Sequence, residues 1–434
     1  MNVGFISLGC SKNLIDTEMA IGLFRKNNYT IVNDPSVAEI IVINTCGFIE
    51  PAKEEAINTI LEMSEFKKDK CKYLIVMGCL AERYKDELKK ELPEVDLFVK
   101  FSEYDSFWNQ IESVIGKSEV KVNEDLDFLD RVVTTGENYA YLRIGEGCNN
   151  NCTYCAIPRI RGKYVSRKLE DVIKEAKMLA KSGIKEIIVI AQDTTKYGID
   201  LYGEPKLAEL LKKLCTIDGI EWIRFLYAYP ESISDELLDV VKNNEKICNY
   251  FDIPIQHYSD SILKKMARKV KSSDIKKLVL KIRKEIPDSI IRTTVMVGFP
   301  TETEDDFQKL YDFVKEAKFD RLGAFSYSKE EGTPAEKIKG HIHHMTKKSR
   351  YNKIMKLQQE ISAENSKSQI GRELKVLLEE RSFDGKYYVG RSYMDVPDID
   401  GVVFVNCKEE NLEGQFVNVK ISGAQGYDLI GDII

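Results

Sequence analysis

Short apolar runs that alternate with helical stretches constrain the fold of this chain more than any other feature. Between about Tyr139 and Ser328, six runs rich in β-branched and aromatic residues recur at 141–144, 186–191, 222–227, 250–255, 291–297 and 321–327. Between them, apolar residues repeat with helical spacing, as at Val172, Ala176 and Leu179. Strands that alternate with helices predict parallel β/α units. Right-handed crossovers would curl six such units into an open barrel.

The carboxyl ends of these strands are the expected place for chemistry. In a partial TIM-like (β/α)6 barrel, functional residues gather at that edge. The polar residues and the glycine that follow the predicted strands are Gln192, Asp193, Tyr229, Gln256, His257 and Gly298. A lone histidine in such a position is more often a hydrogen-bonded wall residue than a catalyst, so both readings stay open for His257.

Three cysteines follow the first of these strands in a C-x3-C-x2-C run: Cys148, Cys152 and Cys155, here called the loop cysteines. Iron-sulfur clusters are usually held by four thiolates, so three protein ligands would leave one iron open to a substrate or cofactor. An open metal position indicates catalysis rather than structure. The alternatives are a zinc knuckle and a disulfide loop. Zinc would need a second Cys or His pair within about twenty residues, yet the next cysteine is Cys215 and the first histidine is His257.

A second group of cysteines lies in the N-terminal part of the chain. Three apolar runs each end in a cysteine, at Cys10, Cys46 and Cys79, here called the edge cysteines, and a helical pattern follows each run. These β/α repeats predict a doubly wound parallel sheet, in which ligands bind beyond the carboxyl ends of the strands. The three thiols should then meet at one edge and could hold a second cluster. Chance placement of buried cysteines is the alternative.

The four other cysteines have no such pattern. Cys71 precedes its predicted strand and should lie at the opposite edge of the sheet, so we do not expect it to be a ligand. Cys215, Cys248 and Cys407 are isolated in the sequence, and core or surface roles are expected for each.

Composition limits the class of protein. A chain of 434 residues is too long for one core, so two or three domains are expected. No apolar run approaches the 18 or more residues of a membrane span, and the first residues begin a strand without a charged leader. These features predict a soluble, cytoplasmic protein, in which a disulfide is disfavoured. The net charge of -6 argues against a large non-specific grip on nucleic acid.

The motifs around both cysteine groups resemble those of a known family. Residues 7–13, 44–49, 146–148 and 155–162 look like the motifs of the methylthiotransferase family of radical S-adenosylmethionine (SAM) enzymes. The octapeptide at 191–198, AQDTTKYG, resembles the branch that modifies an aspartate of a small-subunit ribosomal protein rather than the branch that modifies tRNA. Thr301 departs from the family, which usually has glycine at this turn.

This resemblance implies two 4Fe-4S clusters and SAM as cofactors. It implies that the loop cysteines hold the cluster that binds and cleaves SAM, and that Tyr154 lies beside the adenine. Gln192, Asp193, Gln256 and Gly298 are the other candidates for the SAM side. The edge cysteines would hold the cluster that carries the transferred sulfur. The target would be the β-carbon of an aspartate in the S-twelve protein of the small ribosomal subunit, with an external electron donor and sulfur source. No catalytic side chain beyond the cluster ligands is implied.

The C-terminal segment is predicted to form a small β-barrel, because short strands and turns alternate from about Ser368 onwards. Residues 424–431 resemble the end of a TRAM domain, a module often associated with RNA. The segment from Lys367 on contains eight Lys and Arg and twelve Asp and Glu, among them Asp395, Asp398 and Asp400. These charges predict a solvated acidic face on the small barrel, which would repel phosphates and attract a basic ribosomal protein.

Three domains are therefore expected: a methylthiotransferase domain with the second cluster at 1–116, a radical SAM core at 134–364 and a TRAM domain at 367–434. Two alternative functions remain. One is a tRNA adenosine methylthiotransferase with the same cofactors, and the other is a non-enzymatic iron-sulfur or zinc module.

Overall fold

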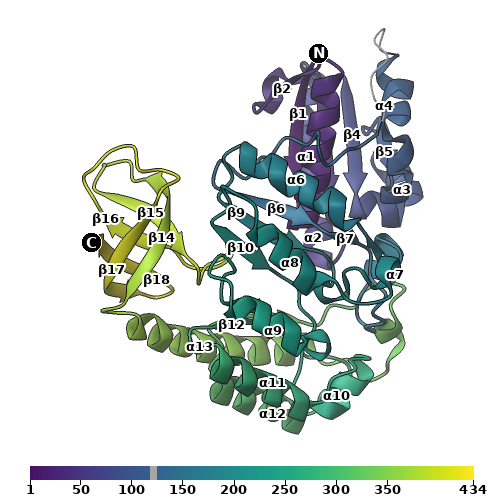
Figure 1. Cartoon of the computed structure of the whole chain (residues 1–434). Helices are drawn as coiled ribbons and strands as arrows, with labels where there is room; N and C mark the ends of the chain where they lie inside the picture. Colours follow the sequence, from purple (N-terminus) through teal and green to yellow (C-terminus); the bar gives the residue numbers. More distant parts are fainter. Residues whose placement is uncertain (118–124) are drawn as a thin grey trace.

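The computed structural model describes residues 1–117 and 125–434 (Figure 1). The chain forms an N-terminal sheet, drawn in purple to blue, a central barrel in teal to green and a C-terminal barrel in yellow. Within the described ranges, no helix combines the length and the apolar character needed to cross a membrane.

The N-terminal part is a five-stranded parallel sheet with the strand order β2-β1-β3-β4-β5. Its strands are β1 (Asn2–Ser7), β2 (Thr30–Val32), β3 (Ile40–Thr45), β4 (Tyr73–Gly78) and β5 (Leu97–Val99). Its helices are α1 (Ser11–Lys26), α2 (Glu50–Ser64), α3 (Cys79–Glu91) and α4 (Phe107–Ile115). Helices α1 and α4 pack on one face and α2 and α3 on the other, which confirms the predicted doubly wound sheet.

The central strand β3 explains why this sequence forms such a sheet. All six of its residues are buried. Ile41 and Ile43 face the core under α2 and α3, and Ile40 and Val42 face the core under α1 and α4. A parallel strand covered on both faces therefore appears in the sequence as one continuous apolar run.

The central part contains the six predicted barrel strands. They are β6 (Tyr139–Arg143), β9 (Glu186–Ile190), β10 (Trp222–Phe225), β11 (Tyr250–Asp252), β12 (Ile290–Val297) and β13 (Arg321–Ser326). A short ribbon is formed by β7 (Gly145–Glu146) and β8 (Val165–Ser166). The helices are α5 (Ile157–Ile160), α6 (Leu169–Lys181), α7 (Ile199–Tyr202), α8 (Leu207–Cys215), α9 (Asp235–Lys242), α10 (Asp260–Lys265), α11 (Ser272–Glu285), α12 (Glu304–Ala317) and α13 (His344–Ser368).

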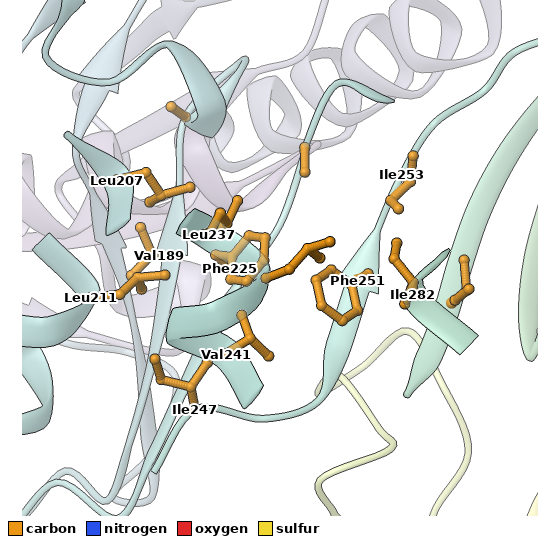
Figure 2. Close-up of a cluster of buried hydrophobic side chains, with 14 of the residues drawn as sticks. Val189, Leu207, Leu211, Phe225, Leu237, Val241, Ile247, Phe251, Ile253 and Ile282 are labelled. Carbon is orange, nitrogen blue, oxygen red and sulfur yellow. The ribbon is translucent and has the colours of Figure 1, made fainter. Parts of the chain in front are cut away.

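These strands are parallel and follow the chain order expected of an open barrel. The two runs β6-β9-β10 and β11-β12-β13 meet through a parallel bridge between Ile223 and Ile247. The main core lies between the strands and the outer helices, where Val189, Phe225 and Phe251 pack with side chains of α8 and α9 (Figure 2). The predicted partial barrel is therefore confirmed.

The C-terminal part is a closed barrel with the strand order β14-β15-β16-β18-β17, which confirms the predicted small β-barrel. Its strands are β14 (Glu373–Arg381), β15 (Tyr387–Ser392), β16 (Val403–Asn406), β17 (Phe416–Gln425) and β18 (Asp428–Ile433).

Three aspartates counted toward the expected acidic face contact the central barrel. Asp395 is buried and its Oδ1 lies 2.7 Å from Arg321 Nη2 of β13. The side chain of Asp400 is likewise buried, and it accepts a hydrogen bond of 2.6 Å from the hydroxyl of Tyr250 in β11. Asp398 stays exposed but accepts from the hydroxyl of Tyr139 at 2.8 Å. The three carboxylates therefore attach the small barrel to the central barrel.

A buried chain of charges makes the same connection. Arg391 of β15 places Nη1 2.8 Å from Glu186 Oε2 in β9, and Arg224 of β10 places Nε 2.9 Å from Glu186 Oε1. Arg391 also pairs with Glu379 of β14 at 2.7 Å. Since a buried charge is tolerated only when it is paired, this chain fixes one docking geometry for the small barrel.

Thr301 lies at the turn between β12 and α12, where the family usually has glycine. Its φ is +69°, a left-handed conformation that strains a β-branched residue. Relief of such strain gains about 1–3 kcal/mol, and the entropy of an unfolded glycine removes about 0.4–1 kcal/mol of this. We therefore expect Thr301→Gly to raise the free energy of unfolding by about 1 kcal/mol, measured by urea denaturation.

Thr303→Ala, two residues further on, is the matched control for this prediction. Thr303 caps α12 by accepting from the Asp306 N–H, so its loss should lower stability by about 1 kcal/mol. A destabilised Thr301→Gly variant would contradict the assignment of strain.

Candidate functional site

The edge cysteines come to one edge of the N-terminal sheet. Cys10 and Cys46 follow β1 and β3, and Cys79 begins α3 directly after β4. These three strands are neighbours in the sheet, in parallel register. The chain order reverses between β1 and β3, and open α/β sheets bind ligands at such a switch point. Cys71 precedes β4 and so lies at the other end of that strand.

Two asparagines hold the loops that carry these thiols. Asn13 donates from Nδ2 to the carbonyls of Leu8 at 3.0 Å and Thr45 at 3.1 Å. Asn44 donates from Nδ2 to the Asn13 carbonyl at 2.7 Å. The loop after β1 is thereby tied to the loop after β3. Both asparagines belong to the sequence motifs described above, although no pattern in the sequence indicated a role for either.

The loop cysteines follow the β6–β7 segment at the carboxyl edge of the central barrel. The backbone N–H of Asn150 donates to Cys148 Sγ at 3.4 Å. Cys152 Sγ lies 3.7 Å from the Tyr229 hydroxyl and 3.9 Å from Arg268 Nη1. Tyr229 was expected at this edge, whereas no pattern in the sequence pointed to Arg268. Donors around the sulfurs are the environment that tunes a thiolate-held cluster.

Cys79, Cys148 and Cys152 are buried and Cys46 and Cys155 are half-buried, whereas Cys10 is exposed. Burial raises the pKa of Cys79 and of Cys155 to about 12. Metal binding would therefore displace protons from these groups. In the described part of the chain, no three Cys, His, Asp or Glu side chains meet the geometry for one metal ion. Thiolates of an iron-sulfur cluster bind different iron atoms and lie further apart than the ligands of a single ion. Each set offers three thiolates, which suits an iron-sulfur cluster with one open iron, whereas a structural zinc site takes four protein ligands.

The two cysteine groups adjoin one another. Cys79 packs with Ala156 and Ile160 in one buried cluster, and Ala156 directly follows Cys155. Arg161, at the end of α5, donates from Nη2 to Cys79 Sγ at 3.5 Å and to Asn13 Oδ1 at 2.6 Å. The segment that leaves the loop cysteines therefore contacts the edge cysteines directly.

A buried ion cluster locks α1 of the N-terminal sheet against the central barrel. Asp16 Oδ1 lies 2.5 Å from Arg143 Nη1, and Asp16 Oδ2 lies 2.7 Å from Arg161 Nη1. Glu146 pairs with both arginines, at 2.9 and 3.2 Å. Burial opposes the charge of Asp16, but the two arginines outweigh it and lower the pKa of this carboxyl.

Tyr154 and Gln192 are two of the five residues expected on the SAM side, and their surroundings differ from each other. Tyr154 packs against a buried apolar cluster that includes Met266, Phe299 and Tyr327. Gln192 donates from Nε2 to Glu146, while its buried Oε1 has no hydrogen-bond partner. Gln192 therefore presents an unused acceptor at the end of β9.

The other three are held by the protein itself. Asp193 is 0% exposed and accepts from Asn150 Nδ2 at 2.8 Å, so it anchors the loop that carries Cys148 and Cys152. Gln256 has a φ of +67° and its main chain pairs with β12. Gly298 has a φ of +72°, and a Cβ there would lie 2.4 Å from Lys347 Cγ, so the turn requires glycine.

His257 has the surroundings of a wall residue. Its ring is 0% exposed, and Nδ1 accepts the Ser259 N–H at 2.9 Å. Burial lowers the pKa of His257 to about 3, against the opposing field of Asp306 and with the help of Arg350. Its Nε2 lies 3.9 Å from the carboxylate of Glu302.

This histidine should make the protein sensitive to acid. The folded state keeps the ring neutral while the unfolded chain takes up a proton below pH 6.5, so stability falls as the pH drops through that value. Between pH 7 and pH 5 the loss from His257 should be about 2 kcal/mol. His257→Asn keeps an acceptor for the Ser259 N–H and removes the titration, so its urea unfolding should depend less on pH by that amount. If the free energy of unfolding depended equally on pH in the two proteins, the lowered pKa of His257 would be contradicted.

Comparison with known proteins divides the chain into the same three parts. The family model of the radical SAM superfamily matches residues 142–314. The models of the uncharacterized protein family UPF0004 and of the TRAM domain match residues 2–100 and 370–434.

Distant solved structures share the fold. The radical SAM methyltransferase TsrM from Kitasatospora setae, with cobalamin and a [4Fe-4S] cluster bound, has a TM-score of 0.57 at 12% identity over 77% of this chain and 73% of its own. The cobalamin-dependent radical enzyme OxsB, with SAM bound, has a TM-score of 0.51 at 15% identity over 84% of this chain and 56% of its own.

Much closer relatives are known by sequence. Proteins named ribosomal protein uS12 methylthiotransferase RimO from Alkaliphilus oremlandii, Lachnoclostridium phytofermentans and Clostridioides difficile are 62%, 51% and 50% identical to this chain. The alignments cover 100%, 99% and 100% of this chain and 99% of each relative. The chain therefore belongs to the RimO family of radical SAM methylthiotransferases.

Proposed function

We propose that this enzyme places a methylthio group on the β-carbon of an aspartate in ribosomal protein uS12. In this proposal the loop cysteines hold the 4Fe-4S cluster that binds SAM, and the edge cysteines hold a second 4Fe-4S cluster. When bound, the clusters and SAM supply the radical and the transferable sulfur, chemistry that no side chain provides. An external electron donor and a sulfur source are required as well.

The contact between the two cysteine groups carries this proposal. Because Cys79 packs against Ala156, next to Cys155, the two sites adjoin. A reaction that activates a carbon at one site and delivers sulfur from the other needs this proximity, since a carbon radical must not meet water or oxygen on the way. An enzyme with a single open cluster would not need two adjoining cysteine groups.

The side chains around the sulfurs hold and orient them. Arg161 and Asn13 fix the Cys79 region, and Asp193 fixes the loop of Cys148 through Asn150. Tyr229 and Arg268 approach the sulfur of Cys152. Such outer partners set ligand orientation and the properties of the metal site.

For SAM itself we propose contacts from Tyr154, Gln192, Gln256 and Gly298. The free Oε1 of Gln192 supports a hydrogen bond to the ligand. The tight turn at Gly298 supports a close approach of the main chain. Asp193 would act indirectly, through the loop that it anchors.

Other carboxylates of the small barrel, together with Asp398, line a hollow, and we propose that uS12 docks there. Glu379, Glu380, Glu413 and Asp398 of the small barrel, together with Glu137, line a hollow of about 710 Å³ between the barrel and the segment before β6. Arg391 lies at its base but is already paired with Glu186 and Glu379. A basic ribosomal protein fits an acid-lined hollow, which would repel the phosphates of tRNA.

Incubation of the reconstituted holoenzyme with SAM, reductant and sulfide tests the proposal. Purified uS12 and tRNA are offered in separate reactions and in competition, and products are read by mass spectrometry. We expect a methylthio gain on an aspartate of uS12 and none on tRNA. A gain on tRNA alone would assign the enzyme to the other branch. A protein that cannot cleave SAM would refute the enzymatic function.

Charge reversal tests the docking surface separately. The double variant Glu380→Lys, Glu413→Lys should raise the KM for uS12 about tenfold or more while SAM cleavage without substrate stays unchanged. Glu360→Lys, an exposed site on α13, is the matched control. An unchanged KM in the double variant would remove this hollow as the docking site.

A further inference from the structure

Lys12 is a largely buried cation at the contact between the N-terminal sheet and the central barrel, and the activity described so far has no use for it. It is the second residue of α1 and lies two residues after Cys10. Only 7% of the residue is exposed. Its Nζ lies 3.3 Å from the ring centroid of Tyr227, which follows β10 of the central barrel. The ammonium thus extends from the N-terminal sheet to the barrel.

No anion balances this charge within residues 1–117 and 125–434. None of the ion pairs or side-chain hydrogen bonds found there involves Lys12 Nζ. The acidic residues further along α1 are paired with arginines: Asp16 pairs with Arg143 and Arg161, and Glu18 pairs with Arg131. Removing a charge from water is costly unless the charge is paired, and a cation–π contact with one ring offsets only part of that cost. An ammonium on a largely buried side chain without an anionic partner therefore marks a place for a negative group from outside the chain.

The N-terminus of α1 adds to the positive electrostatic potential around Lys12. Cys10 at the helix N-cap forms no side-chain cap, and the first turn has no acidic residue. The partial positive charge of the free N–H groups therefore adds to that of Lys12.

Tyr227 is held rigidly in this position. Its φ of +61° is uncommon outside glycine, and the main chain is fixed by Asp252, which accepts its N–H at 2.9 Å, and by Thr194, which donates to its carbonyl. Two residues further on, Tyr229 approaches Cys152 Sγ. Strain of this kind persists only where the surroundings enforce it, and it often marks a functional site. Lys12 therefore contacts the same loop after β10 from which Tyr229 approaches Cys152.

We propose that Lys12 binds the side-chain carboxylate of the target aspartate, an inference that rests on the function proposed above. The β-carbon that receives the methylthio group is bonded directly to that carboxylate. Binding of the carboxylate by Lys12 would therefore place the β-carbon between the edge cysteines and the loop cysteines. Lys12 is thus a positioning and specificity residue, which distinguishes aspartate from asparagine by charge.

Peptide binding to the holoenzyme tests this role without relying on turnover. A labelled peptide from uS12 with the target aspartate, and the same peptide with asparagine there, are titrated by fluorescence anisotropy without reductant. Wild-type enzyme should bind the aspartate peptide at least tenfold more tightly. Lys12→Met should bind both peptides equally and weakly, and Lys12→Arg should restore part of the preference. Lys26→Met, on the exposed part of the same helix, should behave as wild type.

Two further measurements separate the possible outcomes. Iron and sulfide content should be equal in wild type and Lys12→Met; a loss in the variant would assign Lys12 to the edge-cysteine cluster and overturn the proposal. A Lys12→Met enzyme that retains the preference for aspartate would also overturn it, while the function in uS12 modification would stand. If the wild-type enzyme fails to modify uS12 at all, both proposals fall together.

Discussion

Replacing the three loop cysteines with alanine is expected to abolish the cleavage of SAM to 5′-deoxyadenosine, whereas replacing the three edge cysteines should leave that cleavage intact and abolish methylthio transfer. Each triple variant loses every protein ligand of one proposed cluster. The two cysteine groups lie on separate loops of separate sheets, so one set of thiols can be removed while the other remains.

Chemical analysis and product assays check this prediction together. Iron and sulfide in each triple variant should fall to the amount of one cluster. Deoxyadenosine is quantified by chromatography and modified uS12 by mass spectrometry. Cys71→Ala is the matched control, because Cys71 belongs to the same sheet but to its opposite edge, and it should retain all iron and both activities. Loss of SAM cleavage in the edge-cysteine variant would contradict the division of roles.

Asp16→Asn is expected to have the largest effect on stability. It removes the carboxylate that pairs with Arg143 and Arg161 in a buried setting. Breaking a buried pair by removing one partner costs about 3–5 kcal/mol, because the remaining charge is left uncompensated. Glu146 keeps a contact with both arginines, so a loss of about 3 kcal/mol is expected.

Urea denaturation followed by tryptophan fluorescence measures this loss, since Trp108 lies in the core of the N-terminal sheet. Asp305→Asn removes an exposed partner of Lys309 and should change stability by less than about 0.5 kcal/mol. Because Arg161 also contacts Cys79, the Asp16 variant should lose methylthio transfer more than SAM cleavage. Equal stability of the Asp16 and Asp305 variants would contradict a structural role for the buried ion cluster.

The fold could be predicted from the sequence because its signals are local. β3 is buried on both faces and therefore forms a continuous apolar run, and cysteines that directly follow parallel strands must gather at one edge. The spacing within the loop cysteines is likewise a short-range pattern. These features place the two cysteine groups without any knowledge of how distant segments meet.

Contacts between distant segments could not be predicted. Asp400 looks like any surface aspartate in the sequence, yet it meets Tyr250, 150 residues away. Arg161 belongs to a motif, but the sequence around it does not indicate that it pairs with Asp16, 145 residues earlier. The isolation of Lys12 is visible only when every acidic residue around it has been placed. The charge of a segment therefore says little about its surface until its ion pairs are known.

The buried chain from Arg391 through Glu186 to Arg224 also limits how this architecture can be recombined. A foreign small barrel that lacks an arginine at this position would leave Glu186 short of a partner inside the central barrel, a penalty of several kcal/mol. Exchange of the C-terminal module between relatives, whether by evolution or in a laboratory chimaera, therefore requires Arg391 and Glu186 to be inherited as a pair.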